Sequence, residues 1–178
     1  MSKTIRRINF YGGPGSGKSR LAAKVFSSLV DYNVAHVTEW IKKWAIQGIK
    51  PESEDELFVF ANQVHEEDLL LRKVDFIVTD SPIFLNVCYS SFYGYEGSES
   101  LIKLAKNFDA KYKPLNFYIN RTVPFEQFGR YQDFNQSIEF DNYLLNFISK
   151  HVDGENHIID VNNFDAIIDL IKEKLNEC

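Results

Sequence analysis

The stretch that decides the fold is residues 12–19, GGPGSGKS, which fits the pattern G-x-x-x-x-G-K-[ST]. Its glycines permit backbone conformations closed to other residues, so that successive N–H groups can converge on the β-phosphate of a nucleotide. Lys18 would bridge the β- and γ-phosphates, and the Ser19 hydroxyl would ligate Mg²⁺. The helix expected to begin near Gly17 directs its positive dipole end at the same anion. The predicted nucleotide-binding residues are Gly13, Gly15, Ser16, Gly17, Lys18, Ser19 and Arg20.

Apolar patterns on both sides place this loop between a strand and a helix. Ile5, Ile8 and Phe10 precede it as in a strand, and apolar residues at helical spacing follow over 21–29. Apolar runs then alternate with helical patterns, which predicts a parallel sheet with right-handed crossovers. Further strands are expected at 33–37, 74–79, 115–119 and 157–161, and further helices around 40–44, from 53, through 84–88, at 98–112, at 137–151 and through 167–175. The sequence therefore predicts an α/β, single-domain P-loop NTPase fold with a five-stranded parallel sheet flanked by helices.

Composition limits the alternatives. The 178 residues, 44% of them hydrophobic, suit one domain spanning 1–178. Lys and Arg total 20 against 25 Asp and Glu, and this net charge of −5 favours a small acceptor, although a local basic groove stays possible. Cys88 and Cys178 have no metal-ligand spacing, and no signal peptide or membrane span is visible. We therefore expect a cytoplasmic protein with no membrane partner.

Two acidic residues follow predicted strands. Asp80 ends the run 76–79 and would hold Mg²⁺ opposite Ser19, although an Asp in this position is also a common helix cap. Glu39 ends the run 33–37 and is the candidate general base, because an acceptor hydroxyl needs a carboxylate to orient it and to take its proton. The alternative is a helix-start Glu favoured by the helix dipole.

Residues 121–136 are polar and aromatic without clean periodicity, and we interpret them as a mobile lid. Arg121 and Arg130 are its candidate catalytic residues, since planar guanidinium groups can neutralise charge on a transferring phosphoryl group.

The long helix from residue 53, opened by a capping box at 53–56, carries candidate acceptor-binding residues. The amide of Gln63 can bond to a base edge and Phe60 can stack on the ring, although a core or surface amide is an equally good reading of Gln63. Its apolar face is expected to comprise Leu57, Phe60, Ala61, Val64 and Leu71.

Taken together, the phosphate loop, 37–39 (VTE), Gln63, 79–82 (TDSP) and 129–132 (GRYQ) resemble the phage-type P-loop kinases. That group is related to the nicotinamide riboside kinase domain and to deoxynucleoside kinases, and it includes the 5-hydroxymethyluracil DNA kinases. The resemblance implies ATP and Mg²⁺ at Lys18 and Ser19 and an acceptor hydroxyl at Glu39. It further matches the strand-three acidic residue with Asp80, the base-contacting glutamine with Gln63, and the lid arginine with Arg130. Deoxynucleoside kinases carry an arginine after the strand-three acidic residue, where this chain has Ser81, so their acceptor specificity does not transfer.

The leading hypothesis is an ATP- and Mg²⁺-dependent phosphotransferase acting on a nucleotide hydroxyl, free or in DNA as 5-hydroxymethyl-deoxyuridine. The alternatives are a kinase of an ordinary nucleoside or of nicotinamide riboside, and a regulatory NTPase that acts on a partner. If the protein is phage-encoded, its cytoplasm is that of the host cell. Which of Glu39 and Asp80 is the general base stays open.

Overall fold

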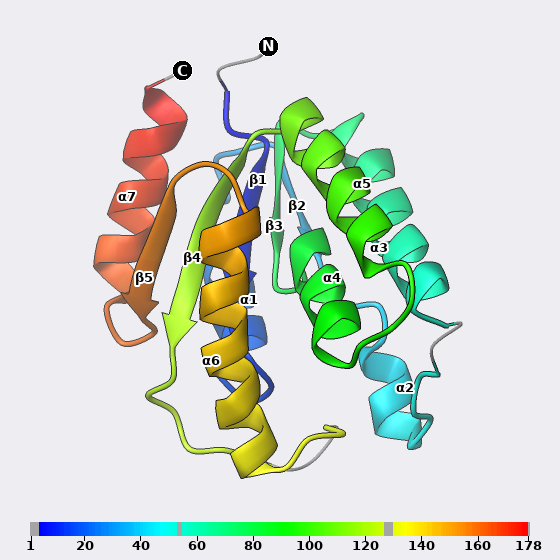
Figure 1. Cartoon of the computed structure of the whole chain (residues 1–178). Coiled ribbons are helices and arrows are strands. Elements are labelled where there is room, and N and C mark those ends of the chain that lie inside the picture. The colour runs from blue at the N-terminus through cyan, green and yellow to red at the C-terminus, as the bar shows by residue number, and fades with distance from the viewer. Residues whose placement is uncertain (1–3, 53–54, 127–129, 178) are drawn as a thin grey trace.

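Five parallel strands form one sheet in the order β2-β3-β1-β4-β5, shown in Figure 1. The computed structural model describes residues 4–52, 55–126 and 130–177. The strands are β1 Arg7–Tyr11, β2 Val34–Val37, β3 Phe76–Thr79, β4 Pro114–Asn120 and β5 Asn156–Asp160. The helices are α1 Lys18–Ser27, α2 Lys42–Gln47, α3 Asp55–Leu71, α4 Ile83–Phe92, α5 Ser98–Lys111, α6 Phe134–His151 and α7 Phe164–Asn176. The predicted parallel five-stranded α/β fold is confirmed.

Helices cover both faces of this sheet, and two hydrophobic clusters separate the layers. One cluster packs α1 and α7 against one face, and the other packs α3, α4, α5 and α6 against the opposite face. Strand β1 contributes side chains to both layers, because successive side chains of a strand point to opposite faces of the sheet. Ile8 and Phe10 join the α1–α7 layer, whereas Arg7, Asn9 and Tyr11 face the other layer, and all five are buried.

Helix α3 corrects part of the sequence prediction. Leu57 and Ala61, expected on the apolar face, are exposed. The buried row is instead Glu56, Val59, Phe60, Gln63, Glu67 and Leu71. Polar residues take part in this row because Gln63 and Glu67 hydrogen-bond within a buried network around Arg7, which apolar periodicity does not detect. The predicted capping box at 53–56 lies partly outside the described residues.

Helix α6 also begins earlier than predicted, at Phe134 rather than at residue 137. Asp133 is its N-cap and accepts from the Gln136 backbone N–H, while the Gln136 side chain accepts from the Asp133 backbone N–H. This capping box therefore ends the predicted lid at residue 133.

The carboxyl ends of the strands meet at the lower edge in Figure 1, with both described chain ends at the upper edge. Parallel pairing brings the loop after β1, Glu39 after β2, Asp80 after β3 and Arg121 after β4 to this lower edge. Helix α2 lies there too. Within the described ranges, no helix is long and apolar enough to cross a membrane.

Candidate functional site

The phosphate loop leads directly from β1 into α1. Gly15 has φ +75° and Gly17, the N-cap of α1, has φ +94°, which is left-handed backbone that favours glycine. A Cβ on Gly15 would also lie 2.9 Å from the ring of Phe125. The Gly13 N–H donates to Asp141 Oδ1 of α6 at 2.7 Å. The loop is thus held open by its own backbone and anchored to a helix more than a hundred residues away along the chain.

Lys18 lies inside this loop, where its ammonium donates to the Gly13 carbonyl at 3.0 Å. The side chain is only 8% exposed, and burial lowers its pKa, an effect that the nearby carboxylates of Glu39, Asp80 and Asp141 oppose. A desolvated cation among carboxylates is well placed to bind an anionic phosphate.

The Ser19 hydroxyl and the Asp80 carboxylate fit a Mg²⁺ site in their chemistry, since hydroxyl and carboxylate oxygens are the donors this ion prefers. In this structure the Lys42 ammonium donates to Ser19 Oγ at 3.2 Å. The described residues contain no cluster of three or more His, Cys, Asp or Glu side chains suited to a metal. A bound Mg²⁺ would therefore take its other ligands from phosphate and water.

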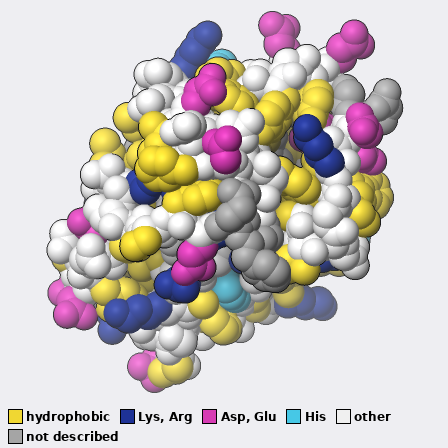
Figure 2. Space-filling view, turned by 90° about the horizontal axis from the view of Figure 1, so that it is seen from below, with side chains coloured by type: hydrophobic (Ala, Val, Ile, Leu, Met, Phe, Trp, Pro, Cys, Tyr) yellow, Lys and Arg dark blue, Asp and Glu magenta, His cyan; other side chains and the backbone are white. Residues whose placement is uncertain are grey.

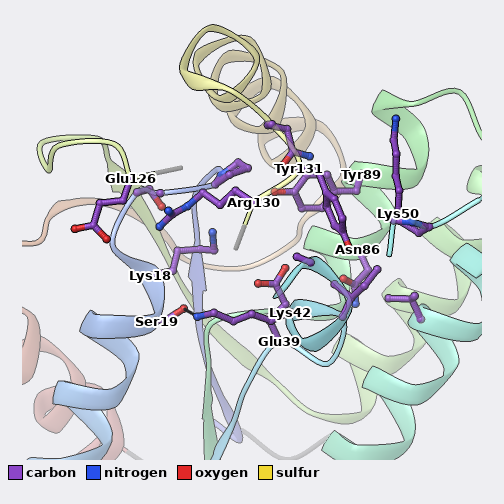
Figure 3. Close-up of a pocket in the computed structure, with 18 of the residues that line it drawn as sticks. Lys18, Ser19, Glu39, Lys42, Lys50, Asn86, Tyr89, Glu126, Arg130 and Tyr131 are labelled. Carbon is purple, nitrogen blue, oxygen red and sulfur yellow. Dashed lines mark hydrogen bonds between the residues drawn. The ribbon is translucent and has the colours of Figure 1, made fainter. Parts of the chain in front are cut away.

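Glu39 follows β2 and is fixed to the end of β3, because its backbone N–H donates to Asp80 Oδ1 at 3.2 Å. Its side chain enters the cavity beside Lys18, as Figure 3 shows. Burial raises the pKa of Glu39, Asp80 raises it further, and Lys18, Lys42 and Arg130 act in the opposite direction. Asp80 itself is 2% exposed and lies behind the Glu39 backbone, which suits a metal or positioning role better than contact with an acceptor.

The cavity has a volume of about 710 Å³ and two ends. The phosphate loop, Ser19, Arg20 and Glu126 line one end. Away from the loop, side chains of α3, of α4 and of the segment after α4 line the other, which is rich in tyrosine. These are Glu56, Val59, Asn86, Tyr89, Tyr93 and Tyr95.

The lid segment crosses this cavity. Arg130 lines it, with its guanidinium 5.5 Å from the centre of the Phe125 ring, close to Gly15. Tyr131 donates to the carbonyl of Ile49, and Gln132 Nε2 donates to Tyr93 Oη at 2.7 Å. Tyr131 and Gln132 therefore contact the loop after α2 and the C-terminal end of α4, and both line the cavity together with Arg130. Gly129, part of the predicted lid motif, lies outside the described residues.

Arg121 lies at the start of the lid segment, near enough to the phosphate loop for its charge to act on Lys18. Its Nε donates to Asp141 Oδ2 at 2.7 Å, and the side chain is 10% exposed. Its Nη1 and Nη2 atoms have no hydrogen-bond partner within 4–52, 55–126 and 130–177. Asp141 thus joins Arg121 to the phosphate loop, and a catalytic role for Arg121 stays a prediction.

The structure corrects the two residues expected to contact an acceptor base. Gln63 is fully buried and donates to Glu67 Oε1 at 3.1 Å, and Phe60, 4% exposed, packs in the core. Both side chains lie on the buried side of α3. This side packs against β1 and against the other helices of the same layer. Neither residue lines the cavity, and Gln63 Oε1 has no hydrogen-bond partner among the described residues.

Sequence reasoning missed several residues of the cavity. Asn86 could have been noticed in the sequence, because it is the polar residue in the otherwise apolar run 83–88 of α4. Tyr131 stands in the lid motif 129–132, but the sequence assigns it no role of its own. No sequence pattern pointed to Asp141 and Lys42, because their positions depend on how α6 and α2 pack against the phosphate loop.

Comparisons with known proteins agree with this architecture. Residues 7–162 match the family described as AAA domain (AAA_28). No curated protein sequence matches the chain.

Three solved structures are similar over 97% of the chain at low identity. Deoxyadenosine kinase from M. mycoides has 12% identity and a TM-score of 0.63, and the match covers all of that chain. Thymidylate kinase from Ehrlichia chaffeensis has 15% identity and a TM-score of 0.67, covering 99% of that chain. A NadR protein in complex with NR has 15% identity and a TM-score of 0.69, and the match covers half of that longer chain. These likenesses show a shared fold.

Proposed function

The chain belongs to the AAA domain family, and from this premise we propose that it is an ATP- and Mg²⁺-dependent kinase that phosphorylates a hydroxyl of a nucleotide. The observation that carries the proposal is that Lys18 and Glu39 enter one cavity between a phosphate loop and a covered, tyrosine-lined hollow. A regulatory NTPase would also use the loop and a carboxylate, and the tyrosine-lined hollow beside them supports an acceptor because it gives one a place to bind. The three similar structures, of a deoxyadenosine kinase, a thymidylate kinase and a NadR protein bound to NR, support a nucleoside or nucleotide acceptor.

The proposed reaction is a direct phosphoryl transfer. The acceptor oxygen forms a bond to the γ-phosphorus, the bond from that phosphorus to the bridging oxygen breaks, and ADP leaves. The hydroxyl proton passes to the Glu39 carboxylate, while Lys18 and Arg130 neutralise charge on the phosphate oxygens. A Mg²⁺ ion held by Ser19 and Asp80 would supply further positive charge at those oxygens.

A second observation favours an acceptor carried in DNA, such as 5-hydroxymethyl-deoxyuridine. Trp40, Trp44 and Phe58 form an aromatic cluster with ring centres 5.2–6.4 Å apart, next along the chain to the cavity-lining residues Ile41, Ala45 and Val59. Lys43 lies 4.0 Å from the centre of the Trp40 ring, and Phe58 is 51% exposed. Aromatic and basic side chains together suit single-stranded nucleic acid. Figure 2 looks onto this end of the molecule, where Lys and Arg lie among hydrophobic side chains.

The test is transfer of label from γ-labelled ATP, with Mg²⁺, to a panel of acceptors. The panel comprises deoxynucleosides, their monophosphates, nicotinamide riboside, and DNA with or without 5-hydroxymethyluracil. We expect label in nucleotides or in modified DNA. If label appears only in nucleosides or in nicotinamide riboside, the protein is instead a kinase of that acceptor. ATP binding without transfer to any acceptor would replace the kinase by a regulatory NTPase.

Lys18→Ala is the control for the active centre. Removing the ammonium should lower the transfer rate at least about 100-fold, because it stabilises charge that develops on the phosphates. Lys103→Ala, at an exposed position on α5, should leave the rate unchanged. A Lys18→Ala protein that is folded by circular dichroism and transfers label at the normal rate would contradict the assignment.

A further inference from the structure

Asn86 of α4 is buried, 6% exposed, and yet lines the acceptor end of the cavity. Its Nδ2 atom has no hydrogen-bond partner among the residues that the structure describes. A buried donor left unpaired costs about 1–3 kcal/mol, so such groups in native proteins usually await a ligand or water. Figure 3 shows Asn86 directed into the same hollow as Tyr89 and Tyr131.

A second polar group in this part of the cavity is the carboxyl of Glu56, in the first turn of α3 and 8% exposed. Burial, with the nearby Asp55, raises the pKa of Glu56 to about 7. A carboxyl that is partly protonated near neutral pH both donates and accepts hydrogen bonds. An amide and such a carboxyl together offer neutral donors and acceptors.

The walls between these groups suit a flat ring. Tyr89 stacks on Phe140 with ring centres 4.0 Å apart and planes within 10°, so its orientation is fixed from behind. Val59 and Tyr95 add further apolar and aromatic surface to the lining. Binding sites of this kind hold a planar ligand by its faces and select it by its edge.

We infer that Asn86 and Glu56 recognise the edge of a neutral heterocyclic ring on the acceptor, a role that the sequence assigned to Gln63. Asn86 Nδ2 donates to a carbonyl or ring nitrogen of that edge, and Glu56 pairs with an adjacent N–H or amino group. Nicotinamide riboside, whose ring carries a fixed positive charge, is the comparison ligand that tests whether the ring must be neutral. The inference rests on the proposed function for the presence of an acceptor, and names the part of the acceptor that is selected.

The experiment measures binding by titration calorimetry, without ATP, of four deoxynucleosides, nicotinamide riboside and the ring-free sugar 2-deoxyribose. Wild-type protein should bind at least one deoxynucleoside more tightly than nicotinamide riboside. Asn86→Leu should weaken that binding about 10- to 100-fold, the usual loss when one buried hydrogen bond to a ligand is removed. Because the replaced Nδ2 has no partner among the described residues, we expect this variant to fold.

Two controls separate ring recognition from other effects. Asn107→Leu, at an exposed position on α5, should bind all ligands as wild type does. The Kd for ATP and the weak binding of 2-deoxyribose should be the same in Asn86→Leu and wild type. The inference is overturned if Asn86→Leu binds the deoxynucleoside within twofold of wild type, if ATP binding falls equally, or if no deoxynucleoside binds wild type.

Transfer of label from ATP, followed in parallel, distinguishes the two proposals. Loss of ring binding in Asn86→Leu without any phosphoryl transfer by wild type would refute the kinase and support the ring site. If wild type transfers the phosphoryl group and Asn86→Leu is equally active at a limiting acceptor concentration, the kinase is supported and the ring site is refuted.

Discussion

Glu39 is the residue at which burial and charge act on one carboxyl in opposite directions. Burial raises its pKa, and Lys18 is the strongest of the cations that oppose the rise. A proton acceptor must be ionised to act, so kcat should fall as the pH is lowered through this raised pKa. The fall should therefore occur above the pKa of about 4.3 of an ordinary glutamate.

Glu39→Gln tests this role directly. The amide keeps the shape of the side chain but cannot take a proton, so kcat should fall about 10²- to 10⁴-fold while the Kd for ATP stays within about twofold. The acidic limb of the pH–kcat profile should disappear. Equal losses in kcat and in ATP affinity would instead mark Glu39 as a structural or metal-linked group.

At the scale of elements, α6 acts on the phosphate loop through one side chain. Asp141 accepts from the Gly13 N–H and from Arg121 Nε, both at 2.7 Å, so it ties the helix, the base of the lid and the loop together. A Cβ on Gly13 would collide with this carboxylate, which explains why glycine is needed there. Asp141 is thus a positioning residue for the loop.

Asp141→Asn should loosen the loop and leave the buried Arg121 guanidinium without its counter-charge. We expect the Kd for ATP to rise about tenfold and the unfolding free energy to fall by about 2–4 kcal/mol, measured by calorimetric titration and urea denaturation. Deoxynucleoside binding without ATP should be unchanged, which a general structural defect would not allow. Glu139→Gln, exposed on the same helix, is the matched control.

At the scale of the whole molecule, a buried ionic network joins the sheet to two helices. Arg7 of β1 donates from Nε to Glu67 Oε2 of α3 at 2.8 Å, and from Nη1 to Asp109 of α5. Its guanidinium also lies 4.9 Å from the centre of the Phe108 ring. Burial raises the pKa of both carboxyl groups, and Arg7 opposes the rise.

Arg7→Met should lower the unfolding free energy by about 3–5 kcal/mol at neutral pH, because two buried carboxyls lose their only direct cationic partner within the described parts of the chain. Removing Arg7 raises the pKa of Glu67 and Asp109 further, and a carboxyl with a raised folded-state pKa loses its contribution to stability as the pH rises through that pKa. The deficit of the variant should therefore grow from pH 5 to pH 8 in urea denaturation. The control is Arg72→Met, because Arg72 pairs with Asp68 at the surface and its side chain is 61% exposed. This change should lower the unfolding free energy by about 0.5 kcal/mol or less. Equal losses for the two variants would contradict a special role for the network.

The sequence by itself determined the fold class and the phosphate end of the site. The spacing of glycines, Lys18 and Ser19 in 12–19 is a local pattern, and alternating apolar runs place Glu39 and Asp80 at strand ends, which parallel pairing brings to one edge. Local patterns of this kind are encoded in neighbouring residues. They can therefore be recognised without knowing how the layers of the fold pack.

Only the tertiary structure decided the acceptor end. Gln63 is buried because it hydrogen-bonds to Glu67, which pairs with the buried charge of Arg7, far away in the sequence, and Phe60 is buried in the hydrophobic core beside it. Asn86 and Glu56 line one cavity from two helices, and Asp141 contacts Gly13 from a third. The apolar periodicity of the sequence does not predict this packing. The phosphate loop is encoded in one local stretch, whereas the tyrosine-lined end of the cavity, where we propose that an acceptor binds, depends on how the helices pack over one sheet.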